Sequence, residues 1–478
     1  MLGGLLWTSI EKFGGRVLTL LIFFLLARLL EPADFGLVAI VNSVVGLAYI
    51  FIEMGFTAAL VQKEQLDDTD KDSSFWGSMG LGALIFLAVF AAAPLVAAFY
   101  EEPQLTDLIR VIAITLLMSS LGNTHRGLYQ RNMAFRLIAV RQIAATIVGG
   151  AVGIALALTG YGVWGLVMYL LVRSVVETAL LFFWSDWQPR FSFSMARYQE
   201  LLRFGLNVLG SRLLFYGNGD LINMLIGHFL GLEALGLFSV ASKVYFTFKD
   251  LMINTISNVT VPIFSKLQSK PDELRAVFQD VIEKVSFVTF PVCMVLVGMS
   301  DDFIRIVFGE KWLPASPIMQ LLVMMSIFSL ITSYANDLLL ALGKVFLSFK
   351  INLLSTVLSL IIFFATVPFG ILAVAAGFLV RDAIMAPICM AAIPCSVGLA
   401  YRQITRSLLL AALVAVLSGG AVYLISLVQS GNIWLWIGLK ALVATGVFAF
   451  GIAVFAPAIS LVIRQQTARF LSAFQKAG

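Results

Sequence analysis

The sequence predicts an all-helical protein that crosses a membrane many times. Hydrophobic residues make up 60% of the 478 residues and charged residues only 12%, whereas about a quarter of the residues of a soluble domain are charged. The chain contains fourteen apolar stretches, each long enough for the roughly 20 residues that a bilayer-spanning helix needs. Lysine and arginine gather in alternate loops between these stretches. The three observations together predict fourteen transmembrane helices.

The predicted spans fill most of the chain and leave no room for a large water-soluble domain. All eight tryptophans lie at or near predicted span ends, as expected of side chains that anchor a helix at the membrane interface. The fourteen spans are 7–30, 35–60, 76–99, 105–127, 137–158, 162–184, 199–229, 234–264, 277–299, 316–342, 345–367, 371–393, 407–427 and 433–463.

The distribution of basic residues predicts the orientation of these spans. With the N-terminus in the cytoplasm, the outer loops hold only Arg305 and Lys311, although Arg28, Arg110 and Lys440 lie near outer span ends. Insertion retains basic loops on the cytoplasmic side, so both chain ends are expected inside. The net charge of +5 is then explained by basic loops facing anionic lipid head groups, and nucleic-acid binding is not expected.

The second half of the chain repeats the pattern of the first. An offset of 200 aligns residues 25–37 with 225–237: each segment is a span end, a very short turn with an acid, and Gly-Leu opening the next span. An offset of 208 aligns Gly162 with Gly370 and residues 171–173 with 379–381. Both alignments equate spans one to six with spans seven to twelve. Parallel repeats of this kind are related by an axis along the membrane normal, with the substrate path between them.

The repeat therefore predicts two pseudo-symmetric six-helix lobes around a central cavity, followed by two additional helices. The predicted parts are an N-lobe (1–184), a cytoplasmic linker (185–197), a C-lobe (198–393), and spans thirteen and fourteen with a cytoplasmic tail (394–478).

Basic residues at membrane depth are the strongest functional signal. Each costs a few kcal/mol to insert on translocon scales, so such residues face a wet cavity or pair with acids. A cavity lined by them would attract an anion, and guanidinium groups suit phosphate oxygens. Two alternatives stay open: Arg173–Glu177 and Arg381–Asp382 can be structural pairs, and Lys12 and Arg16 can extend towards the cytoplasm. The candidate residues for a diphosphate or glycan are Lys12, Arg16, Arg173, Arg212, Lys243, Lys249 and Arg381.

Three acids at membrane depth are candidates for coupling transport to a proton or cation gradient. Glu53, Asp220 and Asp250 lie within predicted spans, where desolvation favours the protonated form of a carboxyl group. Neutralisation of Lys12, Arg212 or Lys243 is an equally good explanation. Lys12 and Glu53 are each 18 residues from the first outer turn, so they are expected at similar depth and can pair.

Other chemistry has little support in the sequence. The Walker A pattern is absent, since Gly343-Lys344 is followed by Val345, so the chain shows no means of hydrolysing ATP. The three cysteines lie in or beside apolar spans without paired spacing, and the two histidines are far apart, which argues against a metal site. No cofactor and no enzymatic activity are expected.

Several short segments resemble a known family of exporters. They are residues 27–37, 55–62, Ser74-Phe75-Trp76 and Phe308-Gly309-Glu310-Lys311-Trp312. In this order they resemble the Wzx-type flippases, the polysaccharide transporter branch of the multidrug/oligosaccharidyl-lipid/polysaccharide exporter superfamily, and within it the colanic-acid exporters. The likeness extends through about span twelve.

The resemblance implies an exporter of the bacterial inner membrane that works by alternating access. Its substrate would be an undecaprenyl-diphosphate-linked oligosaccharide, moved from the cytoplasmic to the periplasmic leaflet for lipopolysaccharide or exopolysaccharide synthesis. A polysaccharide polymerase and assembly proteins would be its protein partners. A lipid II flippase is the first alternative, because it shares a cationic cavity. A multidrug antiporter is the second, although its cavity should hold more acids than bases.

Overall fold

The computed structural model describes residues 14–53, 56–63, 65–200, 202–203, 219–393, 397–398, 401–428 and 433–455. Every regular element among these residues is a helix, and eleven helices are long and apolar enough to cross a membrane. The chain forms two compact units, residues 1–239 and 240–478. The prediction of an all-helical membrane protein is thus confirmed.

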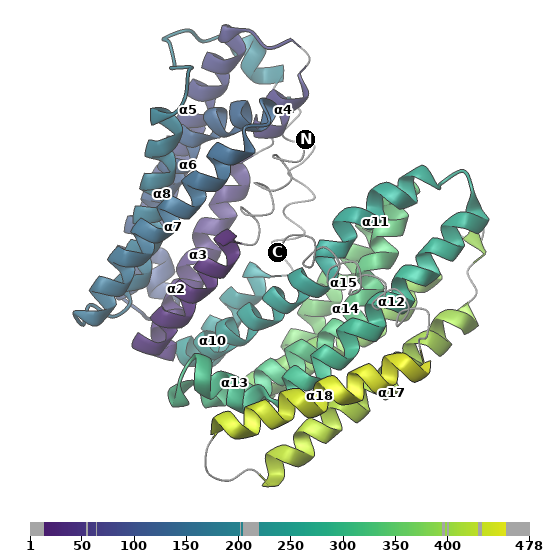
Figure 1. The fold of residues 1–478 in the computed structure, drawn as a ribbon. Helices are drawn as coiled ribbons and strands as arrows, with labels where there is room; N and C mark the ends of the chain where they lie inside the picture. Colours follow the sequence, from purple (N-terminus) through teal and green to yellow (C-terminus); the bar gives the residue numbers. More distant parts are fainter. Residues whose placement is uncertain are drawn as a thin grey trace, which may run out of the picture. The chain divides into compact units, whose positions relative to one another are not determined.

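Most helices of the first unit agree with the predicted spans to within a few residues in the described part of the chain (Figure 1), but the predicted span 35–60 is divided between α3 and α4, and α5 begins eight residues before the predicted start at residue 76. Of the predicted seventh span, residues 199–200, 202–203 and 219–229 are described. The elements are α2 (Gly15–Leu29), α3 (Pro32–Ile52), α4 (Phe56–Gln62), α5 (Asp68–Phe99), α6 (Gln104–Arg131), α7 (Phe135–Leu158), α8 (Trp164–Phe183) and the first part of α10 (Asp220–Lys249).

The second unit contains the remaining helices. Spans thirteen and fourteen, predicted to follow the repeat, are α17, which packs along α12, and α18, which packs against α17. The elements after α10 are η2 (Asp250–Asn254), α11 (Thr255–Lys266), α12 (Pro271–Gly298), α13 (Ser300–Val307), η3 (Glu310–Ala315), α14 (Ser316–Ala341), α15 (Val345–Thr366), η4 (Val367–Phe369), α16 (Ile371–Ala391), α17 (Tyr401–Val428) and α18 (Ile433–Phe455).

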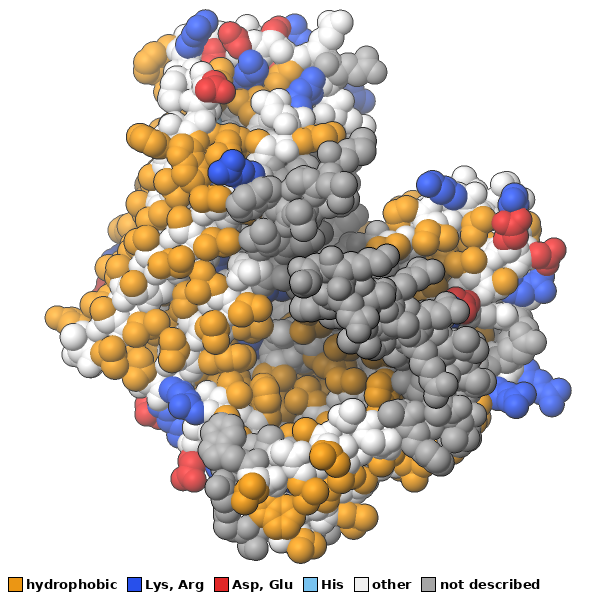
Figure 2. Space-filling view, in the orientation of Figure 1, with side chains coloured by type: hydrophobic (Ala, Val, Ile, Leu, Met, Phe, Trp, Pro, Cys, Tyr) orange, Lys and Arg blue, Asp and Glu red, His pale blue; other side chains and the backbone are white. Residues whose placement is uncertain are grey.

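The surface of each unit has the pattern of a membrane protein. Figure 2 shows hydrophobic side chains along the sides of the helices, whereas lysine, arginine, aspartate and glutamate gather at helix ends. Because the bilayer core cannot hydrogen-bond to exposed polar groups, this distribution fits helices that cross a membrane.

The two turns aligned by the offset of 200 contact each other within the first unit. A Cβ atom on Gly36 would overlap the carbonyl oxygen of Leu232, and a Cβ atom on Gly236 would overlap the carbonyl oxygen of Pro32. The contact is reciprocal, since 236 − 36 and 232 − 32 are both 200. Gly231, with φ 85°, turns the chain just before this contact. Only glycine allows the two backbones to approach this closely.

A second pair of turns also matches between the halves. Met133 between α6 and α7 has φ 53°, and Gly343 between α14 and α15 has φ 71°. In each turn the next amide donates to the carbonyl five residues earlier: Ala134 to Tyr129 at 3.0 Å, and Lys344 to Leu339 at 2.8 Å. Turns of the same geometry also follow α5 and α7, at Glu101 and Gly160, so this match reflects a common way of ending a helix and does not test the predicted repeat.

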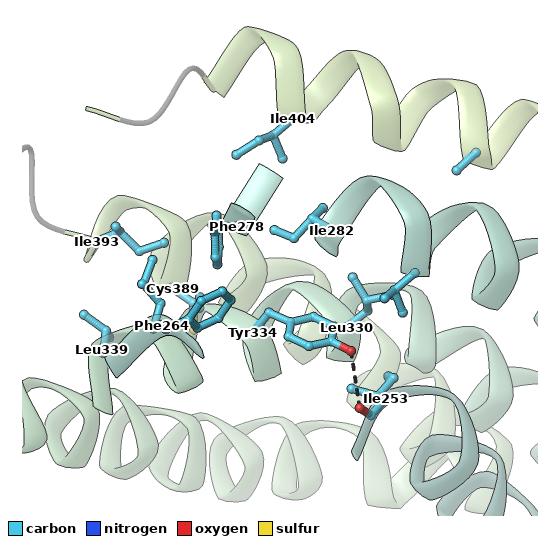
Figure 3. Close-up of a cluster of buried hydrophobic side chains, with 14 of the residues drawn as sticks. Ile253, Phe264, Phe278, Ile282, Leu330, Tyr334, Leu339, Cys389, Ile393 and Ile404 are labelled. Carbon is cyan, nitrogen blue, oxygen red and sulfur yellow. Dashed lines mark hydrogen bonds between the residues drawn. The ribbon is translucent and has the colours of Figure 1, made fainter. Parts of the chain in front are cut away.

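The core of the second unit is a cluster of buried apolar side chains, and Figure 3 marks a hydrogen bond between two of its members, Tyr334 and Ile253. Phe264 and Phe278 pack with ring centroids 5.8 Å apart, and the hydroxyl of Tyr334 donates to the carbonyl of Ile253 at 3.3 Å. Cys293 and Cys389 are buried free thiols, as predicted for small apolar residues, and Cys395 lies outside the described residues.

Lys440 and Trp312, both predicted to lie near span ends, are buried inside the protein. Both are completely buried, Trp312 at the start of the segment leading into α14 and Lys440 in α18. Lys440 forms an ion pair with Asp302 of α13, because a cation can be buried when a carboxylate neutralises it. This pair connects the last described helix to the segment after α12.

The predicted linker is hydrogen-bonded to the first turns of α5. The indole N–H of Trp76 donates to the carbonyl of Arg190 at 2.8 Å, and the amide of Arg190 donates to Asp72 Oδ1 at 3.0 Å. Residues 195–200 are helical.

Lys63 connects the start of α5 to the helical segment 195–200, which begins at the end of the linker. Its ammonium group lies 2.8 Å from Asp70 Oδ1 and 3.2 Å from Glu200 Oε2. Burial alone would lower the pKa of Lys63, but the hydrogen bonds and charges of the two carboxylates outweigh it, so the pKa is raised.

Candidate functional site

A polar pocket of about 360 Å³ lies inside the first unit, between α3, α6 and α8. Two arginines and one glutamate line it, together with neutral polar side chains. Because α3, α6 and α8 all belong to predicted spans, the pocket is at membrane depth. Its polar lining residues are Asn42, Tyr49, Thr115, Ser119, Arg126, Arg173, Ser174, Glu177 and Thr178.

Arg173 confirms the pair predicted from helical spacing. Its Nε donates to Glu177 Oε1 at 3.0 Å, one turn farther along α8, and its Nη1 donates to the hydroxyl of Tyr169 at 3.4 Å. Both partners of the pair line the pocket. Arg173 is therefore a pocket residue and a member of an ion pair at the same time.

Arg126 was not among the candidates predicted from the sequence. Its Nη1 lies 3.0 Å from Glu53 Oε1, so the structure pairs Glu53 with α6. Lys12, the predicted partner, lies outside the described residues. Arg126 is a basic residue inside the predicted span 105–127. The criterion that selected the other cations, a basic residue at membrane depth, could therefore have identified it.

The pocket offers hydrogen-bond donors to a ligand. The Arg126 side chain is 27% exposed and uses Nη1 for its contact with Glu53. A guanidinium group has five N–H donors, and one carboxylate cannot satisfy all of them. An oxyanion would accept these hydrogen bonds, so the arrangement is chemically suited to binding phosphate.

Arg381 is held in a network of the second unit. Its Nη2 donates to Asp382 Oδ1 at 2.7 Å and its Nη1 donates to Ser359 Oγ at 2.8 Å. The other oxygen of Asp382 accepts from Ser329 at 2.7 Å, and Ser329 lies 3.0 Å from the hydroxyl of Tyr245. These contacts favour a structural role for Arg381, which was one of the two interpretations of this pair.

A π-turn, η2, separates α10 from α11. In η2 the side-chain amide of Asn254 donates to Asp250 Oδ1 at 2.6 Å. The hydroxyl of Thr255 donates to the carbonyl of Asp250 at 2.8 Å. A π-turn adds one residue to a helical turn, which rotates the residues after it relative to Lys243 and Lys249. Both lysines are partly buried on α10.

The remaining candidates are dispersed. Arg16 is exposed at the start of α2. Asp220 accepts a hydrogen bond from Ser43 Oγ at 3.4 Å in the first unit. Arg212 lies outside the described residues, so its role stays a prediction.

Known proteins similar to this chain take part in polysaccharide biosynthesis. The family described as polysaccharide biosynthesis protein matches residues 25–317. Teichuronic acid biosynthesis protein TuaB of Bacillus subtilis (strain 168) is 28% identical over 355 residues, 73% of each chain. Lipopolysaccharide biosynthesis protein WzxC of Escherichia coli (strain K12) is 26% identical over 363 residues, 75% of this chain and 73% of the relative.

Solved structures show the same fold at low sequence identity. The inward-closed lipid II flippase MurJ matches with a TM-score of 0.75 and 14% identity, covering 95% of this chain and 99% of its own. An inward-facing multidrug resistance MATE family transporter of the MOP superfamily matches with a TM-score of 0.63 and 13% identity, covering 84% of this chain and 98% of its own. The resemblance to exporters that the sequence predicts is confirmed. Since the family match covers more than half of its residues, the chain belongs to the family of polysaccharide biosynthesis proteins and has the fold of MOP-superfamily transporters.

Proposed function

We propose that this chain moves an undecaprenyl-diphosphate-linked oligosaccharide from the cytoplasmic to the periplasmic leaflet of the bacterial inner membrane. The glycan would then enter surface or exopolysaccharide synthesis, through a polymerase and assembly proteins. Fourteen spans, both chain ends in the cytoplasm and alternating access of two lobes belong to this proposal. The family membership and the relatives in teichuronic acid and lipopolysaccharide synthesis support it.

The pocket of the first unit is the observation that carries the proposal. Arg126 and Arg173 line it together with Glu177, and Glu53 pairs with Arg126, so acids are not in excess there. Each arginine uses part of its guanidinium group on a glutamate 3.0 Å away and keeps other donors for a ligand. We therefore assign the diphosphate group to this pocket, while the lipid tail stays in the bilayer.

The same lining separates the proposal from its alternatives. An organic cation would require acids in excess, whereas each of the two glutamates here is already paired with an arginine. A lipid II flippase would also carry a diphosphate, so the pocket does not distinguish it. The named relatives favour a polysaccharide precursor, whereas the likeness to MurJ concerns the fold.

The test is translocation of a lipid-linked oligosaccharide in proteoliposomes, measured as its accessibility to an added glycosidase. Arg126→Gln and Arg173→Gln should each weaken binding about 10- to 150-fold, since a hydrogen bond to a charged group contributes about 1.5–3 kcal/mol. Lys71→Gln is the matched control, because Lys71 forms an ion pair with Asp68 outside this pocket. Translocation that is unchanged in both arginine variants would refute the assignment.

A further inference from the structure

Asp337 is a carboxylate in an unusual environment. It lies on α14, four residues before that helix ends at Ala341, and its side chain is partly buried. Tyr334 and Leu338 on the same helix are completely buried and belong to the apolar core of the second unit.

No base neutralises Asp337 in the part of the chain that the structure describes. Its Oδ2 is buried and has no hydrogen-bond partner there. Other carboxylates of this unit have partners: Asp382 pairs with Arg381 at 2.7 Å, and Asp302 pairs with Lys440. Asp337 differs from these carboxylates because no basic side chain among the described residues neutralises it.

A second buried polar atom faces it from α11. Ser257 lies beside both the carboxyl group of Asp337 and the phenol of Tyr334. Its Oγ is also buried and forms no hydrogen bond of ordinary geometry with either. The Tyr334 hydroxyl donates a hydrogen bond to the carbonyl of Ile253, so the lone pairs of its oxygen remain available as acceptors. Side-chain oxygens of Asp337, Ser257 and Tyr334 are therefore neighbours, and each can accept a hydrogen bond or coordinate a cation.

The π-turn η2 sets this arrangement. It begins seven residues before Ser257 and ends three residues before it, and Ile253, the acceptor for Tyr334, is part of it. The additional residue of a π-turn changes the direction in which the following residues point, and such turns occur frequently at functional sites. Ser257 therefore reaches α14 from a locally rearranged helix.

An ionised carboxylate that is withdrawn from water without a positive partner is strongly destabilising. We propose that Asp337 and Ser257 form a binding site for a small monovalent cation, the proton or Na⁺, which is exchanged during the transport cycle. The exchange is balanced: the neutral carboxyl group releases one proton when it ionises, and the carboxylate then takes up one proton or one Na⁺. The part of this proposal that concerns the cycle rests on the transport function proposed above, whereas cation binding itself does not.

Two measurements on the purified full chain in lipid nanodiscs test the site without any glycan. Infrared difference spectroscopy detects the C=O band of a buried protonated carboxyl group, and ²²Na⁺ binding detects the alkali ion. The wild-type chain should show one of the two signals, and Asp337→Asn should remove it. Asp272→Asn is the control, because this side chain is 91% exposed and pairs with Arg275.

Ser257→Ala supplies a second test that keeps the carboxyl group. It should shift the C=O band to higher frequency, or raise the Kd for Na⁺ about tenfold, because the hydroxyl that would accept a hydrogen bond from the protonated carboxyl group, or coordinate Na⁺, is removed. If Asp337→Asn does not fold, judged by gel filtration, the serine variant decides. A wild-type chain with neither signal, or a signal that both variants leave unchanged, overturns the proposal. Since no glycan is present, failure of transport in the vesicle assay leaves these readouts intact.

Discussion

The ion pair between Lys440 and Asp302 should couple α18 energetically to the rest of the second unit. The two side chains are 1% and 10% exposed. Removing one member of a buried pair leaves the other charge poorly compensated, which costs about 3–5 kcal/mol. Lys440→Met should therefore lower the free energy of unfolding by about this amount. Replacing both, as Lys440→Met with Asp302→Leu, should restore most of it, because a buried pair replaced by apolar residues is often neutral.

Thiol reactivity provides the assay. Cys293 and Cys389 are buried, so in a Cys395→Ser background a thiol-reactive dye reports unfolding as the fraction of SDS in mixed micelles rises. The coupling energy follows from the double-mutant cycle. Arg305→Met is the control, because Arg305 is 47% exposed and lies 3.9 Å from Glu310, where an ion pair contributes about 0–1 kcal/mol. Single and double variants that add without coupling would refute the reasoning.

Three further outcomes are expected. Gly36→Ala and Gly236→Ala should each destabilise the chain by about 1–3 kcal/mol in the same unfolding assay, since the new methyl group meets backbone that cannot repack; wild-type stability in both would contradict the contact. A thiol introduced at Arg305 should react with an impermeant reagent from outside the cell and one at Ser269 should not, and the opposite pattern would invert the proposed orientation. The two carboxylates raise the pKa of Lys63. Its charge therefore stabilises the linker attachment fully at pH below the pKa of an unfolded lysine, about 10.4, and this stabilisation is lost as the pH rises through the pKa of Lys63 in the folded protein. Trypsin cleavage in the linker should thus accelerate only at strongly alkaline pH, and an acceleration between pH 6 and 8 would assign the attachment to other groups.

The sequence predicts those features of this protein that depend on local spacing. Apolar stretches gave the helix positions, and a four-residue separation on one helix gave the pair Arg173–Glu177, which the structure confirms at 3.0 Å. The pair Arg381–Asp382 is adjacent in sequence and is confirmed as well. In each case the geometry of one helix determines the contact.

Contacts between distant helices could not be predicted in the same way. Glu53 pairs with Arg126, 73 residues away, and Lys440 pairs with Asp302, 138 residues away. Depth along the membrane restricts such partners without choosing among them, since several helices pass at each depth. The π-turn at 250–254 was also missed, because residues before and after it have ordinary helical composition and only the hydrogen bonds reveal the additional residue.

The reciprocal contact of Gly36 and Gly236 has the form of an interface between two identical molecules. In a two-fold symmetric dimer, residue i of one copy contacts residue j of the other, and j contacts i; here position 36 meets 232 while position 236 meets 32. A single half of this sequence, pairing with its own copy, would make the same contact twice. A protein with one such half per chain, assembled as a homodimer, is thus the simplest ancestor for this contact, and gene duplication followed by fusion would preserve it within one chain.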